Sequence, residues 1–109
     1  MRNIAKFEII GRIGKIDTHG NVTHLKVAAN YPRKDEATGE WTDETYWNRV
    51  TVFGERTRKY IADKAQVGDL IRVEGRMRDS SYEKGGETIY TVDRLVDHFG
   101  ILASKAEAA

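Results

Sequence analysis

Aromatic and cationic side chains alternate along residues 46–54, whose sequence is YWNRVTVFG. Because successive side chains of a β-strand point to opposite faces, Trp47, Arg49 and Phe53 would share one face and the valines the other. The valine face suits a core. The other face would offer rings on which unpaired bases stack and a cation that meets phosphate, as single-stranded nucleic acid requires. A strand buried on both faces, with both rings in a second core, fits this run equally well.

The side chains that could support catalysis or metal binding form no recognisable site. The sequence has no cysteine, which excludes a thiolate nucleophile, a disulfide and a cysteine-based zinc site. Its three histidines, His19, His24 and His98, lack the spacing of a metal site, and Ser80 and Ser81 have no nearby base to activate them. We therefore expect no enzyme activity, no metal and no cofactor.

Length and hydropathy limit the class of protein. With 109 residues, the chain fits one domain with a modest core. No apolar run approaches the roughly 20 residues of a membrane-spanning helix, and the N-terminal residues lack the apolar stretch of a signal peptide. We expect a cytoplasmic protein with no membrane partner, associated with the nucleoid if it binds DNA.

Charge is distributed unevenly, although the net charge is only +1. Residues 1–30 hold five basic and two acidic side chains, and residues 49–78 hold eight and four. Residues 31–48 hold two basic and five acidic side chains, and residues 79–109 hold three and six. The basic blocks coincide with the expected strands, which favours a positive sheet face with negative edges, although ordinary surface mixing would also give this pattern.

The apolar pattern predicts strands over most of the chain. Alternation or apolar runs indicate five strands, at residues 3–16, 22–30, 46–54, 70–78 and 89–96. The alternation slips near Gly11 and Gly14, where we expect the first strand to bend or bulge. An amphipathic helix is expected at residues 55–66, and polar loops at residues 32–43 and 80–87.

The order of these elements indicates the fold. Five strands with one helix between the third and the fourth is the order of an OB-fold, an all-β, five-stranded Greek-key barrel. We place this domain at residues 1–102, and we expect residues 103–109 to form a short disordered tail.

The same segments resemble the bacterial-type single-stranded DNA-binding proteins. The resemblance covers residues 3–102, and it rests on residues 3–14, 37–40 (ATGE), 45–54 (TYWNRVTVFG), 73–78 (VEGRMR) and 90–91 (YT). The pattern Trp-x-Arg-Val-x-x-Phe-Gly, followed by a helix and a strand that contains Glu-Gly, is fairly specific to this family. The resemblance implies sequence-tolerant binding of single-stranded DNA by a protein that is not an enzyme.

Aromatic and basic residues become candidate DNA contacts. By the resemblance, Trp47 and Phe53 stack on bases and Arg49 contacts DNA. Tyr82 stands where the family has a third stacking tryptophan, and Tyr31 is the nearest match to a further one. Basic residues of the expected strands are candidate phosphate contacts, namely Arg49, Arg72, Arg76, Arg78, Lys6, Arg12 and Lys26.

Two positions bear on self-association. The residue after the strand tryptophan is commonly histidine in the family and helps to hold subunits together, whereas this chain has Asn48. Tyr90 is a candidate for packing or subunit contact. The resemblance implies a homotetramer, and the missing histidine leaves a dimer as the alternative.

The C-terminal end differs from the family pattern. The family usually continues into a long linker that ends in an acidic peptide, which recruits other proteins. This sequence stops at Ala109 with neither feature, which indicates a shortened chain or a naturally short form, and we expect no tail-mediated protein partners.

The expected function is protection of single-stranded DNA in replication, recombination and repair. A primosome-type accessory OB protein and an OB module that docks a protein are the alternatives.

Overall fold

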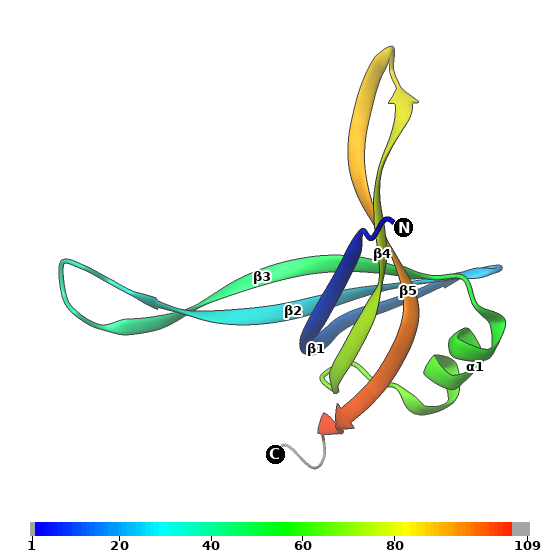
Figure 1. Cartoon of the computed structure of the whole chain (residues 1–109). Coiled ribbons are helices and arrows are strands. Elements are labelled where there is room, and N and C mark those ends of the chain that lie inside the picture. Colours follow the sequence, from blue (N-terminus) through cyan, green and yellow to red (C-terminus); the bar gives the residue numbers. More distant parts are fainter. Residues whose placement is uncertain (1, 106–109) are drawn as a thin grey trace.

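The computed structural model describes residues 2–105 and confirms a closed five-stranded barrel with one helix (Figure 1). The elements are β1 (Lys6–His19), β2 (Val22–Lys34), β3 (Trp41–Val52), α1 (Glu55–Lys64), β4 (Leu70–Lys84) and β5 (Glu87–Ala103). Around the barrel the strands follow the order β1-β2-β3-β5-β4, and β4 pairs with β1. The pairings are antiparallel except for β3 and β5, which meet in parallel at Thr51 and Leu95. This is the OB-fold that the order of the elements predicted.

Alternating side chains of the strands fill the barrel. Nine of the described residues form its buried hydrophobic core: Phe7, Ile13, Leu25, Val27, Val50, Val52, Ile61, Ile71 and Val73. Ile61, which is 1 % exposed, is the buried residue of α1, so the helix contributes to the core through one side chain. As is common in antiparallel sheets, the strands turn one face to this core and the other toward solvent.

Two hairpins extend beyond the barrel as arms (Figure 1). We call the outer part of β2 and β3, residues 28–47, the β2–β3 arm, and the outer part of β4 and β5, residues 78–93, the β4–β5 arm. The β4–β5 arm turns at Gly85 and Gly86, whose φ angles of 58° and 81° suit a two-residue hairpin turn that favours glycine.

The predicted loops at residues 32–43 and 80–87 are wrong in extent. Strand β2 continues to Lys34 and β4 to Lys84, so the connections are residues 35–40 and the two glycines alone. Side chains on the arms have no core to face, and their strands therefore lack the apolar alternation on which the prediction relied.

Strand β1 bends where the sequence indicated. Its register against β2 shifts between Ile13 and Lys15, so Gly14 occupies a bulge. Residues 6–11 pair with β4 but not with β2, and the second edge of this half-strand has no partner strand within the described chain.

The described chain ends just beyond β5. Asp69, which is 2 % exposed, accepts hydrogen bonds from the backbone N–H groups of Gln66 (2.9 Å) and Lys105 (3.0 Å), so the backbone at position 105 is tied to the barrel. The rest of the predicted tail, residues 106–109, lies outside the described residues. No helix within residues 2–105 is long and apolar enough to cross a membrane.

Candidate nucleic-acid interface

The ladder between β2 and β3 puts aromatic and cationic side chains on its outer face. The register runs without a shift along all of β3, so directly opposed residues share a face. Val50 is fully buried, Arg49 is exposed, and Trp47 and Phe53 are 59 % and 56 % exposed. The prediction that one face of this strand serves the core while the other presents rings is confirmed. A second core around the two rings is excluded.

Trp47 is held against the bulge of β1. A side-chain carbon built on Gly14 would lie 2.3 Å from Cζ3 and 2.7 Å from Cη2 of Trp47, well inside van der Waals contact. The indole of Trp47 therefore packs directly on the backbone of Gly14, which has no side chain. Its partner on β2 is Ala28, whose small side chain leaves room for the ring to reach across to β1. One side of the ring is supported by the barrel while more than half of the residue surface stays accessible.

A groove of about 290 Å³ lies between the outer face of β2–β3 and the β4–β5 arm. Arg49 and Phe53 line one wall, and Arg78 and Tyr82 line the other. The register of β4 against β5 places Arg78 and Tyr82 on one face of their arm, and Tyr82 is 51 % exposed. Four of the predicted DNA contacts thus converge from two distant segments of the sequence.

His24 also lines this groove, although the spacing of the histidines alone indicates only a scattered surface residue. Its Nδ1 lies 3.1 Å from Oγ1 of Thr51. Partial burial lowers the pKa of His24 below its ordinary value, and the positive charge of Arg49 and the neighbouring His19 lower it further, while Asp17 acts in the opposite direction. The sequence does contain a signal for this position. His24 and Lys26 alternate with the buried Leu25 and Val27, which places both on the outer face of β2.

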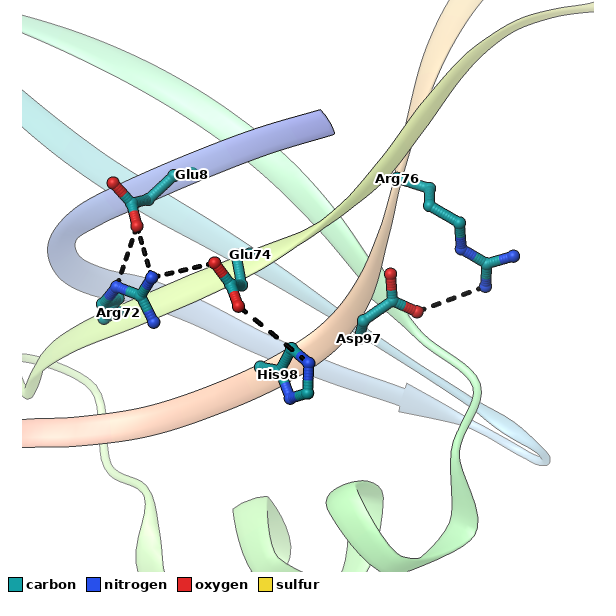
Figure 2. A network of polar contacts seen from close by, with 6 residues as sticks. All are labelled: Glu8, Arg72, Glu74, Arg76, Asp97 and His98. Atoms are coloured by element: carbon teal, nitrogen blue, oxygen red, sulfur yellow. Dashed lines mark hydrogen bonds and ion pairs between the residues drawn. The ribbon is translucent and has the colours of Figure 1, made fainter. Parts of the chain in front are cut away.

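Arg72 and Arg76 lie away from the groove, on the outer surface of β1, β4 and β5, and both are paired with carboxylates (Figure 2). The guanidinium of Arg72 donates to Glu8 and, at 2.8 Å, to Glu74. Hydrogen bonding to Glu8 and the charges of both carboxylates raise the pKa of Arg72. Arg76 lies 3.3 Å from Asp97. Nearby carboxylates therefore offset part of the charge of both cations.

The remaining basic candidates are spread over three places. Lys26 stands directly opposite Arg49 on the outer face, beside the groove. Arg12 donates from Nη1 to the carbonyl of Gly68 at 3.0 Å, which holds it near the loop after α1. Lys6 borders a hollow with Asp97 on the β1–β4–β5 surface. Lys26 is the one of the three that adjoins the rings.

Tyr31 and Asn48 lie on the opposite face of the β2–β3 arm from Trp47. The rings of Tyr31 and Tyr46 pack at a centroid distance of 5.0 Å. With Ile10 and Asn48 they surround a hollow next to β1. Tyr31 is 55 % exposed and Ile10 is 52 % exposed, so this face carries apolar surface of its own, separate from the groove.

Tyr90 lies on the far side of the β4–β5 arm from Tyr82. Tyr90 is paired with Ser81, whereas Tyr82 is paired with Ile89, and adjacent residues of a strand point to opposite faces. Tyr90 is 80 % exposed. Its exposure excludes a packing role inside the barrel, and its position separates it from the groove, so subunit contact stays a prediction.

The groove offers stacking, ion pairing and hydrogen bonding. Its rings, guanidinium groups and hydroxyls are groups that bind a flexible polyanion with exposed bases.

Among the residues that the structure describes, no group of three or more His, Asp or Glu side chains is placed to hold a metal ion.

A sequence profile of the single-strand binding protein family matches residues 4–102, which is nearly the whole chain. The chain therefore belongs to the single-strand binding protein family, whose members bind single strands and are not enzymes.

Solved structures support the same fold. The chain is similar to the Plasmodium falciparum single-strand binding protein in complex with single-stranded DNA, with a TM-score of 0.77 and 18 % identity over 94 % of this chain and 97 % of that one. The mitochondrial single-stranded DNA-binding protein of S. cerevisiae gives a TM-score of 0.74 and 24 % identity, over 94 % and 98 % of the two chains. A small single-stranded DNA-binding protein of Streptomyces coelicolor gives a TM-score of 0.64 and 18 % identity, over 92 % of this chain and 95 % of that one.

Replacing Gly14 with alanine should displace Trp47 without unfolding the barrel, because the added methyl group would occupy the space of the indole. We expect Gly14→Ala to alter the near-ultraviolet circular dichroism of tryptophan. It should also weaken oligo-dT binding by about 1 kcal/mol, within the range of about 1–3 kcal/mol for one stacked base. Gly100→Ala is the control, since nothing lies within 4 Å of its added carbon. Unchanged affinity in Gly14→Ala would show that the support of Trp47 by β1 has no role in binding.

Lowering the pH from about 7 to 5 should have opposite effects on stability and on DNA affinity. Since the fold lowers the pKa of His24 from 6.5, its contribution to stability is complete above pH 6.5 and is lost as the pH falls through the lowered pKa. A phosphate in the groove would favour the imidazolium, so affinity for oligo-dT should increase over the same range. Denaturation and fluorescence titrations of wild type and His24→Gln check this, and equal pH profiles would exclude His24 from the interface.

Proposed function

We propose that the protein binds single-stranded DNA in the groove and along the adjoining outer face of β2–β3. Bases would stack on Phe53 and Tyr82 in the groove and on Trp47 beside it, and phosphates would pair with Arg49, Arg78 and Lys26. The observation that carries this proposal is the convergence of exposed rings and cations on one groove, from the end of β3 (Arg49 and the following Phe53) and from the β4–β5 arm (Arg78 and Tyr82). Every base has a ring face that can stack, so such a groove binds with little sequence preference.

The cations in and beside the groove differ in the charge that they can offer to phosphate. Asp93 lies 3.3 Å from Arg78 and offsets part of its charge. Arg49 and Lys26 are opposed neighbours on the outer face, and both are exposed. We therefore expect Arg49 and Lys26 to contribute most to phosphate binding. Candidates outside the groove would meet a strand only if it continued over the barrel, and these are Arg72, Arg76, Lys6 and Arg12.

The cellular role follows from this mode of binding. A strand whose bases are stacked on protein rings cannot pair with a complementary strand, so binding protects it and prevents duplex formation. We propose that the protein covers single strands during replication, recombination and repair, in a cytoplasmic, nucleoid-associated location. For this proposal we place the binding domain at residues 1–102.

Removing one ring and one cation should separate stacking from ion pairing. Trp47→Ala should weaken oligo-dT binding by about 1–3 kcal/mol and leave the free energy of unfolding nearly unchanged, since the ring lies outside the core. Arg49→Ala should weaken all sequences alike and make the dependence of log affinity on log salt shallower, by about 0.7 for each phosphate that is no longer neutralised. Fluorescence titrations at several salt concentrations measure both effects.

Lys15→Ala is the matched control for Arg49→Ala, because it also removes one positive charge. Lys15 is exposed and paired with Asp17 at 3.3 Å, outside the groove. An equal change of salt dependence in both variants would mean that net charge, rather than the groove, governs binding. Loss of folding in Trp47→Ala would show that the ring has a structural role instead.

We propose that the protein also associates with itself, as a homotetramer with a dimer as the alternative. Residues 6–11 of β1 have one edge without a partner strand within the described chain, which a second copy could extend. The exposed rings of Tyr31 and Tyr46 around Asn48, and Tyr90 on the β4–β5 arm, offer apolar surface for such contacts.

Light scattering at micromolar concentration should report about four times the 12.4 kDa mass of one chain. Tyr90→Ser should shift the distribution toward smaller species, because it removes an exposed ring from the proposed contact surface. Tyr60→Ser, on α1, is the control for loss of an exposed tyrosine elsewhere. A monomer with full DNA affinity would contradict the proposed assembly.

A further inference from the structure

Trp41 lies at the start of β3, near the tip of the β2–β3 arm, where the sequence pattern gives no sign of a functional role. It is one of two tryptophans in the chain. It is 66 % exposed and lies outside the core. An indole in this position covers no buried surface, so the stability of the barrel does not explain it.

Trp41 and Trp47 share one face of the β2–β3 arm. They are six residues apart on one strand, and the register of β2 against β3 continues without a shift between them. At about 3.3 Å per residue, the two positions are about 20 Å apart along the arm. The outer face that carries Arg49 in the groove and Trp47 beside it therefore continues to a second indole.

Trp41 has a cation beside its ring. Nζ of Lys34, its direct partner on β2, lies 6.0 Å from the ring centroid. Arg33 is the other basic residue near the tip. It lies on the opposite face, where its guanidinium is 3.8 Å from Glu44. Lys34 thus adds positive charge on the face that carries both indoles, and a stacked base beside a cation is a favourable arrangement.

The charge of the arm determines how a strand could lie on it. Residues 31–48 carry more acidic than basic side chains, and Asp43 stands on the same face between Trp41 and Trp47. Phosphates placed against Asp43 would be repelled. A bound strand should therefore turn its bases toward the arm and its phosphates toward water, and binding here should depend on stacking more than on salt.

We propose that Trp41 is a further base-stacking site for single-stranded DNA, at the tip of the β2–β3 arm, which is occupied only by strands long enough to leave the groove. This inference rests on the proposed function of the groove. At about 3.4 Å per nucleotide in stacked DNA, the 20 Å between the indoles corresponds to about six nucleotides, or fewer in an extended strand.

The two tryptophans allow each site to be followed separately. Trp47→Phe leaves Trp41 as the single tryptophan, and Trp41→Phe leaves Trp47. Both variants keep an aromatic ring at the changed position. Each is titrated with oligo-dT of increasing length. Short oligonucleotides should quench Trp47 emission alone, and quenching of Trp41 should begin when the oligonucleotide is about six nucleotides longer.

Affinity measurements complete the test. Trp41→Ala should lose about tenfold in affinity for long oligo-dT, keep its affinity for short oligo-dT, and show the salt dependence of the wild type. Asp43→Asn should bind long oligo-dT more tightly. Asp63→Asn is the matched control, because it removes the same charge from α1 rather than from the arm.

The outcomes separate this inference from the proposed function. If saturating long oligo-dT quenches Trp47 but leaves Trp41 emission unchanged, the arm site does not exist while the groove remains. If neither tryptophan is quenched, the groove fails as well. If Trp41 emission changes on dilution of the protein without DNA, Trp41 lies in a contact between copies of the chain, and the inference is overturned.

Discussion

The unbroken ladder between β2 and β3 is the constraint on which the binding surface depends. It joins two long strands in one register, so each position on β3 has a fixed partner and a fixed face. Near the barrel, the inner face supplies Leu25 and Val50 to the core, and this burial holds the register, because a slip of one residue would move both into water. The same register fixes the positions of the side chains on the outer face. The register that positions Trp47 and Arg49 is therefore held by core side chains on the opposite face of the ladder.

The second wall of the groove depends on closure of the barrel. Arg78 and Tyr82 come from β4, far from β3 in the sequence, and they reach the groove because β5 pairs with β4 and also meets β3 at Thr51. Barrel closure and groove formation are thus one event. A change that opened the β3–β5 contact would leave both sets of rings intact but separate them.

Much of the fold could be predicted from the sequence, and so could the groove wall formed by Arg49 and Phe53, because the signals for both lie within short segments of the chain. Alternation along residues 46–54 and around Val73 reports which face is buried, and the bulge at Gly14 appears as a slip in that alternation. The arms could not be delimited in this way, because strands without a core face carry no such signal. The same lack of signal concealed Trp41. The roles of His24 and the paired state of Arg72 depend on neighbours from other strands, which one strand's pattern does not contain.

The absence of a core beneath the β2–β3 arm has a consequence for its motion. Residues 30–34 are all exposed, so the rungs there are held by backbone hydrogen bonds and cross-strand pairs alone, whereas Leu25 and Val50 are fully buried. We therefore expect the arm to open from its tip while the barrel stays closed, and its amide protons to exchange with solvent through this local opening. Near the barrel, the proposed stacking rings stand on a rigid surface. Toward the tip, a more compliant arm would be able to follow the path of a bound strand, which suits a ligand whose backbone has no fixed shape.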